Sequence, residues 1–379
     1  MFRLKQYIKM LLQNVFLPQV YRYFCRRPIR KGSVIFADAH HTEMPFAMRR
    51  MYETVCTMEQ DEVSGQICEV QTFVEDFNQL SFGAMAKFLL SFMKAYATAE
   101  YVFICDYFLP VASCRKRPET KVVQLWHSCG LMKKIAFDAG DDIPKNYKGN
   151  MFGNYSYLTL SAEICVDVHA RALQLPKERI FATGVSRTDY YFDEDWNERC
   201  RERFYRAHPE AAGKKIALWA PTFRGNAANP VLEGLEAVQS AASQLSDQWF
   251  FVIKAHPHID AHGQVSNCQI PTEELLAVAD VLITDYSSVL FDYLIYQKAA
   301  VLFAPDLKQY EQQRGFYLDY RSIPYPIVED AQQLTQAIEQ AIPWCQTHAA
   351  EQETFHKIYT GACDGHATER ILDLIGIIS

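Results

Sequence analysis

The chain has 379 residues, of which 49% are hydrophobic and 22% charged, so it can bury a sizeable core, and disorder or fibrous repeats are excluded. Its formal net charge of -7 argues against a general nucleic-acid-binding protein, which needs positive charge along the phosphate path. The 11 cysteines are odd in number and form no Cys-x-x-Cys pair, which fits neither a disulfide scaffold nor a zinc ribbon and indicates a reducing cytoplasm.

The first predicted element is a basic amphipathic segment, residues 1–32, that we expect to associate with the membrane. Residues 1–37 hold eight Lys or Arg and no Asp or Glu, so the rest of the chain is strongly acidic. One helical face carries apolar side chains, at Leu4, Ile8, Leu11, Leu12 and Val15. Another face carries polar side chains, at Lys5, Lys9 and Gln13. Pro18 is expected to end this helix.

A second basic cluster follows the helix and consists of Arg22, Arg26, Arg27, Arg30 and Lys31. Each cation contributes about 1 kcal/mol beside anionic headgroups, and no acidic residue balances the segment. The alternative is a helix docked on the protein with solvated charges. Since there is neither a run of 18 apolar residues nor a signal-peptide pattern, we expect a peripheral protein on the cytoplasmic face of the membrane.

Two sets of short β-branched or aromatic runs alternate with helical patterns, which predicts two parallel α/β domains. The first set, in an expected domain of residues 33–195, comprises runs 33–37, 101–105, 121–125, 157–160 and 179–182. A charged stretch, 192–215, marks the boundary. The second set, in an expected domain of residues 213–345, comprises runs 215–220, 249–254, 281–284, 300–303 and 326–328. A C-terminal helical segment, 346–379, completes the expected organisation.

Polar residues follow many of these runs, at the sheet edge where open α/β sheets bind ligands. The segment Asp285-Tyr-Ser287-Ser288 lies between strand 281–284 and an amphipathic helix, 289–296, so its serines fall at a helix N-terminus that favours an anion. Residues 289–291 place no carboxylate in the first turn, which leaves that end open to an external phosphate, with Ser288 the better ligand. The alternative is an ordinary N-cap.

A second polar loop follows strand 249–254, where Pro257 stops the strand and directs the loop outward. Lys254 and His258 add charge near His256, and cationic groups beside the phosphate site favour a functional histidine, since an imidazolium can stabilise a phosphoryl transition state. A structural, hydrogen-bonded histidine is the alternative for His256.

His127 ends the buried run 121–125 in the first domain and is expected to face the cleft between the domains. A neutral imidazole in that position can take a proton from an attacking hydroxyl at physiological pH. A satisfied core histidine is an equally open alternative.

Arg224 and Arg314 are candidates for bidentate phosphate contacts, although each could equally be a surface arginine. The loop acids Asp138, Asp141 and Asp142 fit no metal motif, so we expect no metal, no cofactor and a metal-independent reaction. Neither a P-loop nor a Gly-x-Gly-x-x-Gly fingerprint is present, which supports neither a P-loop kinase nor a standard dehydrogenase.

Taken together and in order, several segments resemble the CDP-glycerol glycerophosphotransferase family of teichoic acid and capsule synthesis. The segments that carry this resemblance are Gln124-Leu-Trp-His-Ser-Cys-Gly-Leu-Met-Lys-Lys134, Gly184-Val-Ser-Arg-Thr-Asp189, Trp219-Ala-Pro-Thr-Phe-Arg224, Ile253-Lys-Ala-His-Pro-His258, Leu282-Ile-Thr-Asp-Tyr-Ser-Ser-Val-Leu-Phe-Asp292 and Arg314-Gly-Phe-Tyr-Leu-Asp319. The sequence departs from the family pattern at Ser128-Cys129, which bears on the acceptor, and at Ser186.

The resemblance implies a GT-B-like architecture, in which two Rossmann-like domains face each other across a cleft. It implies transfer of glycerol phosphate from CDP-glycerol to a hydroxyl of a lipid-linked disaccharide or polyol-phosphate acceptor, with release of CMP. The family's motif histidines correspond to His127, as base, and His256, as stabiliser of the phosphate, and its phosphate contacts correspond to Ser287 and Ser288. Arg224, Lys254, Asp285 and Arg314 are the further donor-binding candidates.

Three alternatives stay open. A ribitol-phosphate transferase of the same family would use CDP-ribitol. A GT-B glycosyltransferase would use a nucleotide sugar and release a nucleoside diphosphate, since fold does not fix substrate. A catalytically silent, membrane-bound protein would bind the nucleotide without turnover.

Overall fold

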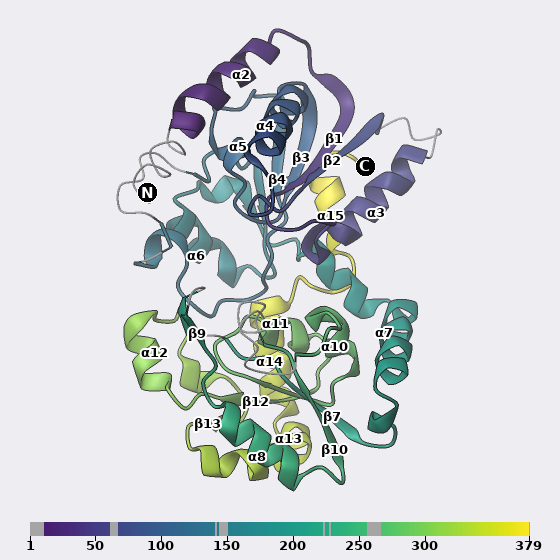
Figure 1. Cartoon of the computed structure of the whole chain (residues 1–379), viewed down its shortest axis with the longest axis vertical. Coiled ribbons are helices and arrows are strands. Elements are labelled where there is room, and N and C mark those ends of the chain that lie inside the picture. Colours follow the sequence, from purple (N-terminus) through teal and green to yellow (C-terminus); the bar gives the residue numbers. More distant parts are fainter. Residues whose placement is uncertain are drawn as a thin grey trace. The chain divides into compact units, whose positions relative to one another are not determined.

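The computed structural model describes residues 11–60, 67–140, 142–143, 151–222, 224–226, 229–255 and 267–378. The chain forms two compact units, each built from separate stretches of sequence (Figure 1). The first unit comprises Met1–His127, Ala136–Asp189 and Ala362–Ser379. The second unit comprises Ser128–Ile135 and Tyr190–Gly361. The chain therefore passes between the units four times, and the first crossing falls directly after His127.

The first unit is built on a parallel six-stranded sheet with the strand order β2-β1-β3-β4-β5-β6. Its strands are β1 (Arg30–Asp38), β2 (Glu69–Val74), β3 (Ala99–Ile104), β4 (Lys121–Gln124), β5 (Tyr157–Thr159) and β6 (Ile180–Phe181). Its helices are α2 (Leu17–Phe24), α3 (Phe46–Gln60), α4 (Phe82–Tyr96), α5 (Leu109–Ala112), α6 (Ile164–Leu173) and α15 (Ala367–Leu374). The strand order reverses between β1 and β3.

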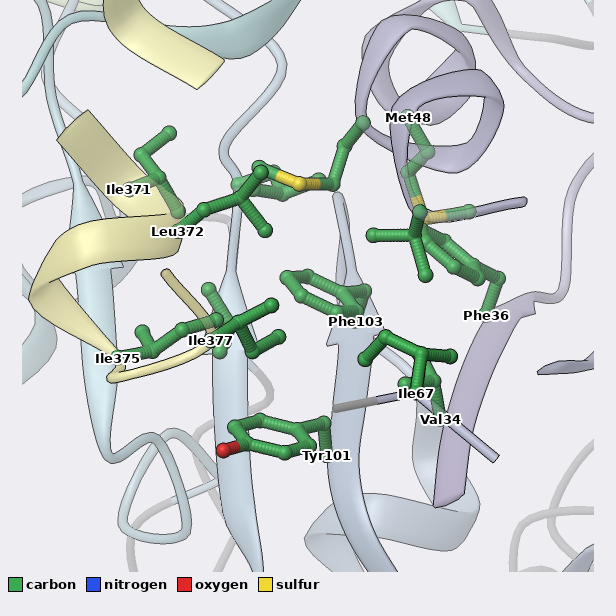
Figure 2. Packing of buried hydrophobic residues seen from close by; sticks show 14 of the residues in the cluster. Val34, Phe36, Met48, Ile67, Tyr101, Phe103, Ile371, Leu372, Ile375 and Ile377 are labelled. Carbon is green, nitrogen blue, oxygen red and sulfur yellow. The ribbon is translucent and has the colours of Figure 1, made fainter. Parts of the chain in front are cut away.

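The core of the first unit includes side chains from both ends of the chain. Phe36 of β1 stacks on Phe103 of β3 with their ring centroids 4.9 Å apart. Met48 of α3 packs over the same strands, and Figure 2 shows Ile371 and Ile375 of the C-terminal segment pointing into this cluster. The expected C-terminal segment 346–379 is thus divided, because α15 packs in the first unit while the helix before it belongs to the second.

The second unit is built on a parallel five-stranded sheet with the order β10-β7-β11-β12-β13. Its strands are β7 (Lys215–Trp219), β10 (Trp249–Ile253), β11 (Val281–Thr284), β12 (Ala299–Phe303) and β13 (Ile327–Val328), with a separate hairpin of β8 (Arg224–Asn226) and β9 (Asn229–Val231). Its helices are α7 (Glu194–Ala207), α8 (Leu235–Gln244), α10 (Thr272–Val278), α11 (Val289–Leu294), α12 (Leu307–Gln313), α13 (Leu334–Thr347) and α14 (Ala349–Thr360). The strand order reverses between β7 and β11.

The predicted α/β class with two parallel sheets is confirmed. Each of the ten predicted runs overlaps an observed strand of these sheets. Two features were not predicted from the sequence: β2, none of whose residues is fully buried, and the short hairpin of β8 and β9. In the part of the chain that the structure describes, no helix is both long and apolar enough to cross a membrane.

The N-terminal helix continues past the residue that was predicted to end it. Leu4, Lys5, Ile8 and Lys9 lie outside the described residues. Pro18 does not end the helix, because a π-helical turn, Leu12–Phe16, precedes it and α2 continues to Phe24. A widened turn relieves the clash between a proline ring and the carbonyl group four residues earlier.

The face of this helix that is buried also differs from the predicted face. α2 packs on α4 with Leu17 and Tyr21 buried, and Gln13, expected on the polar face, is only 6% exposed. Leu11 and Val15, expected on the apolar face, are 48% and 53% exposed. The docked side is therefore the one that carries positions 13, 17 and 21, at a spacing of four residues.

The N-terminal cations have acidic partners that the local sequence does not contain. Arg30 forms an ion pair with Glu69 of β2, and Lys31 Nζ lies 3.3 Å from Glu100 Oε1 of β3. The expectation that no acidic residue balances the segment is wrong at these two positions, because β1 lies between β2 and β3 in the sheet.

Candidate functional site

Both sheets have the strand order of doubly wound folds, in which ligands bind beyond the carboxyl ends of the strands where the order reverses. In the first unit that point lies at the ends of β1 and β3. In the second unit it lies at the ends of β7 and β11, which lead into Pro221-Thr222 and into Asp285-Tyr-Ser-Ser288.

His127 follows β4 at the carboxyl edge of the first sheet, and its side chain is exposed. Its Nδ1 lies 3.1 Å from the carbonyl oxygen of Cys105, the residue that follows β3. A carbonyl oxygen only accepts hydrogen bonds, so Nδ1 carries the proton and Nε2 of the neutral ring keeps its lone pair. This tautomer is the one that a general base acting through Nε2 requires.

The ring of His127 is also held by its neighbour in the chain. Trp126 has a positive φ of 57°, which is rare for a bulky residue, and its backbone N–H donates to the side-chain oxygen of Gln124 at 3.1 Å. The indole stacks on His127 with ring centroids 5.1 Å apart and meets His169 edge to face at 5.2 Å. A strained backbone at the edge of a sheet is typical of functional sites.

Two residues of the Gly184–Asp189 segment have structural roles in the first unit. Arg187, which is 6% exposed, donates from Nη2 to the backbone carbonyl of His127 at 3.2 Å. Asp189 accepts hydrogen bonds from the first backbone N–H groups of α15, at 3.0 Å from Ala367 and 2.8 Å from Thr368. The segment therefore fixes the backbone of His127 and caps the C-terminal helix.

The turn that follows His127 belongs to the second unit and docks on α11. Gly130 has a φ of +65°, and a Cβ atom there would lie 2.3 Å from the ring of Phe291. Cys129 donates from Sγ to Asp292 Oδ1 at 3.5 Å. Only glycine allows this approach, which explains why the turn carries glycine at position 130.

The serines of the second sheet edge lie at the start of α11, as predicted. Ser287 Oγ accepts from the backbone N–H of Val289 at 3.3 Å, whereas Ser288, at the N-cap, makes no side-chain cap bond. The expectation that no carboxylate lies in the first turn is incomplete, because Asp292 closes that turn. Asp292 is buried and accepts the Cys129 bond, so it faces into the protein.

Arg224 occupies an internal ion-pair network. Its Nε and Nη2 donate to the two carboxylate oxygens of Asp306 at 2.7 and 2.9 Å, Nη2 also donates to Asp285 at 3.0 Å, and Nη1 donates to the Thr222 carbonyl at 2.5 Å. Burial alone would lower the pKa of Arg224, but the bonds and charges of Asp306 and Asp285 outweigh it and raise that pKa. Four of the five guanidinium N–H groups are engaged, so one has no hydrogen-bond partner among the described residues.

Asp285 joins the two loops at this edge. Its Oδ1 accepts from the backbone N–H groups of Thr222 at 2.8 Å and Tyr286 at 2.6 Å, and the side chain is almost fully buried. Asp285 therefore fixes the loop that holds Ser287 and Ser288. Nearby, Thr222 Oγ1 is buried and has no hydrogen-bond partner among the described residues, which marks it as a further ligand group for a phosphate.

The remaining candidates of the second unit contact backbone. Lys254 donates from Nζ to the carbonyl of Cys268 at 2.7 Å, and Arg314 donates from Nε to the carbonyl of Lys134 at 3.1 Å. The second contact lies beside an antiparallel bridge between Lys133 and Phe316. His256 lies outside the described residues.

The first sheet edge also holds two polar residues that were not predicted from the sequence as site residues. Asp38 ends β1, and its carboxylate accepts from Nδ1 of His41 at 2.8 Å. The run 33–37 leads directly into Asp-Ala-His-His, so the same strand-end rule that selected His127 would have selected this pair.

The two loop acids that the structure describes contact other protein groups. Asp138 pairs with Arg171 at 2.9 Å, Asp142 accepts from the backbone N–H of Ala136 at 2.9 Å, and Asp141 lies outside the described residues. Across the described ranges, no group of three or more His, Cys, Asp or Glu residues is placed to hold a metal ion.

Comparison with known proteins covers both units. The model of a protein family described as CDP-Glycerol:Poly(glycerophosphate) glycerophosphotransferase matches residues 19–376. The chain is 28% identical over 371 residues to the teichoic acid ribitol-phosphate primase of Bacillus spizizenii, covering 92% of each protein. It is 29% identical over 296 residues to the teichoic acid glycerol-phosphate primase of Bacillus subtilis, covering 73% of each.

The fold is similar to a solved structure over nearly its whole length. The structure of the wall teichoic acid polymerase TagF aligns with a TM-score of 0.74 and 18% identity, covering 98% of this chain and 97% of that one. The expected fold class, with two Rossmann-like domains of the GT-B-like type, is confirmed by this similarity.

Proposed function

Because the chain belongs to the CDP-glycerol:poly(glycerophosphate) glycerophosphotransferase family and is a polyol-phosphate transferase of teichoic acid synthesis, we propose that its donor is CDP-glycerol. The reaction is transfer of glycerol phosphate to a hydroxyl of a lipid-linked acceptor, with CMP as the leaving group. The O–P bond to the acceptor forms as the bond between the β-phosphorus and the CMP oxygen breaks.

His127 is the proposed general base, and its geometry is the observation that carries the proposal. The Cys105 carbonyl holds the proton on Nδ1, so the exposed Nε2 can accept the proton of the acceptor hydroxyl. Arg187 supports this role, because it holds the His127 backbone from the buried side.

The loop from Asp285 to Ser288 is the proposed site for the donor diphosphate. Ser288, at the start of α11, has a side chain that makes no cap bond, and Thr222 Oγ1 adds a hydroxyl that has no hydrogen-bond partner among the described residues. Arg224 contributes one remaining N–H and mainly positions Asp285, while Lys254, His256 and Arg314 add positive charge. A group of positive side chains can neutralise a diphosphate without a metal ion.

Attachment to an anionic membrane surface is part of this proposal, since the proposed acceptor is lipid-linked. The outer side of the N-terminal helix exposes Leu11, Val15 and Phe16 by about half, and Arg22 and Arg26 are exposed nearby. Apolar side chains flanked by cations are typical of helices that lie in a membrane interface. The opposite side of the same helix is docked on α4, so docking and membrane contact occur on different faces.

CDP-ribitol is the second candidate donor. The ribitol-phosphate primase covers 92% of this chain, whereas the glycerol-phosphate primase covers 73%, and the identities are 28% and 29%. The two donors differ by two hydroxymethylene groups, so the pocket that binds the polyol decides between them.

The test is a donor competition with product masses as the readout. Purified protein is incubated with a synthetic lipid-linked disaccharide and equal concentrations of CDP-glycerol and CDP-ribitol, with UDP-linked and CDP-linked sugars as control donors. We expect glycerol phosphate to be added with one CMP released for each addition. A ribitol phosphate product would establish the second candidate, and release of a nucleoside diphosphate would establish a glycosyltransferase instead.

A further inference from the structure

We propose that Asp38 and His41, at the carboxyl end of β1, form a subsite that binds hydroxyl groups of the acceptor's sugar or polyol. This inference rests on the proposed function, because it names the part of the first unit that holds the molecule to be extended.

Asp38 fixes the orientation of the His41 imidazole, which is accessible to solvent. Asp38 is 3% exposed, and its Oδ2 accepts three hydrogen bonds, from the backbone N–H groups of His40 at 2.7 Å and His41 at 2.9 Å and from Nδ1 of His41 at 2.8 Å. The His41 side chain is 54% exposed. With Nδ1 bound to the carboxylate, Nε2 is the nitrogen left for a ligand.

The turn that carries the pair is braced from the neighbouring strand. After β2, the backbone N–H of Glu75 donates to the carbonyl of Asp38 at 3.3 Å, and that of Phe77 donates to the carbonyl of Ala39 at 3.0 Å. A ligand that binds here therefore meets a preorganised site, and ordering the turn adds little to the cost of binding.

The position of the pair in the fold is where doubly wound sheets bind ligands. Asp38 ends β1, and Cys105 follows β3, on the two sides of the reversal in strand order. Cys105 contacts both groups of interest, with its Sγ 3.9 Å from Asp38 Oδ1 and its carbonyl 3.1 Å from His127 Nδ1. The pair thus lies two strands from the proposed base, with β3 between them, on the same sheet edge.

The charges around His41 favour hydroxyl groups over a phosphate. Asp38, Asp76 and Asp106 all act on the ring, and His40 lies beside Asp38 and Asp76. The hydrogen bond that His41 donates to Asp38 raises the pKa of His41, against the opposing effect of burial. Three carboxylates outweigh one or two imidazoles, so the local field repels a phosphate, whereas the His41 imidazole can hydrogen-bond a neutral hydroxyl.

The test compares acceptor and donor parameters in His41→Ala. With a soluble disaccharide acceptor, we expect the acceptor KM to rise about tenfold, while calorimetry shows donor affinity within twofold of wild type. His41→Gln, whose amide can replace Nε2, should recover part of the loss. Lys177→Ala is the control, because Lys177 is exposed just before β6, at the opposite edge of the same sheet.

Binding of the disaccharide is also measured without turnover, from the NMR signals of the His41 ring in the wild-type protein. We expect these signals to shift with the disaccharide but not with inorganic phosphate. An unchanged acceptor KM in a folded, active His41→Ala enzyme overturns the subsite, as does a shift with phosphate alone. If the wild-type protein transfers no polyol phosphate while the disaccharide still shifts His41, the proposed function fails and the subsite stands.

Discussion

Three histidines of the first unit share a hydrogen-bonded Nδ1 but differ in the surroundings of the ring. In each ring, Nδ1 is hydrogen-bonded inside the protein, to the Cys105 carbonyl for His127, to the Asp38 carboxylate for His41 and to the Cys165 carbonyl at 2.8 Å for His169. A carboxylate favours the protonated ring, whereas full burial favours the neutral one. The same side chain is therefore an exposed ring beside a carbonyl at His127, a ring whose pKa is raised by a carboxylate at His41, and a buried core residue at His169.

His169 is the neutral member, and this has a pH-dependent consequence. Burial lowers its pKa to about 4, while an unfolded histidine titrates near pH 6.5. The unfolded chain therefore takes up the proton first, so this residue destabilises the fold progressively as pH falls from about 6.5 to about 4. NMR titration should show the His169 ring neutral at pH 5, with His41 titrating above 6.5 as the internal comparison. A His169 ring half-protonated at pH 6.5 contradicts the buried placement.

Ser288 is expected to bind the donor through a single hydrogen bond. Its side chain makes no cap bond, so Ser288→Ala leaves the helix start intact and removes only the ligand contact. We expect donor binding to weaken by about 1 kcal/mol, the typical net contribution of one hydrogen bond. Titration calorimetry measures this, with exposed Ser243→Ala on α8 as the control. Equal donor affinity in Ser288→Ala and wild type would place the phosphate elsewhere.

At the scale of elements, the turn after His127 depends on one close contact. Gly130 has a positive φ, and a methyl group there meets the Phe291 ring at 2.3 Å. Gly130→Ala should lower the free energy of unfolding of the second unit by at least about 2 kcal/mol, from backbone strain and overpacking together. Gly140→Ala is the matched control, because its φ is not positive and its new methyl group would meet no atom of the described residues within 4 Å. Equal thermal stability of the two variants would contradict the docked turn.

Ten of the strands were predictable because they are short apolar runs, and the polar residues that follow many of them also located His127, Ser287 and Ser288. Partners brought together from distant segments were not predictable. Arg224 was expected to meet phosphate, but Asp285 and Asp306 lie 61 and 82 positions further along the chain and take most of its donors. Glu69 and Glu100 likewise reach Arg30 and Lys31 only through the order of the strands.

At the scale of the whole molecule, two sheets of the same winding order carry different groups at their reversal points. The first edge presents imidazole and carboxylate, whereas the second presents serine hydroxyls and a helix start. This division fits a transferase that takes a proton from one substrate and binds the phosphates of the other. The difference between the two edges comes from their side chains, because the two sheets have the same type of topology.

Membrane association is expected to depend on the outer side of the N-terminal helix. Replacing Leu11, Val15 and Phe16 together by serine removes the exposed apolar side chains and keeps Leu17 and Tyr21 docked on α4. We expect this variant to stay in the supernatant when wild type sediments with anionic liposomes, while it still uses a soluble acceptor. Deleting the whole helix is a poorer test, because it would also uncover α4. Equal sedimentation of the triple variant and wild type would show that the membrane contact lies on another surface.

The most direct test of the central claim is the comparison of transfer and donor binding in His127→Ala. If His127 is the base for the acceptor hydroxyl, transfer from the CDP-polyol falls by about 10²- to 10⁴-fold, and donor affinity measured by calorimetry stays within a few fold of wild type. Transfer at a wild-type rate, or donor binding lost in parallel with activity, would contradict the account.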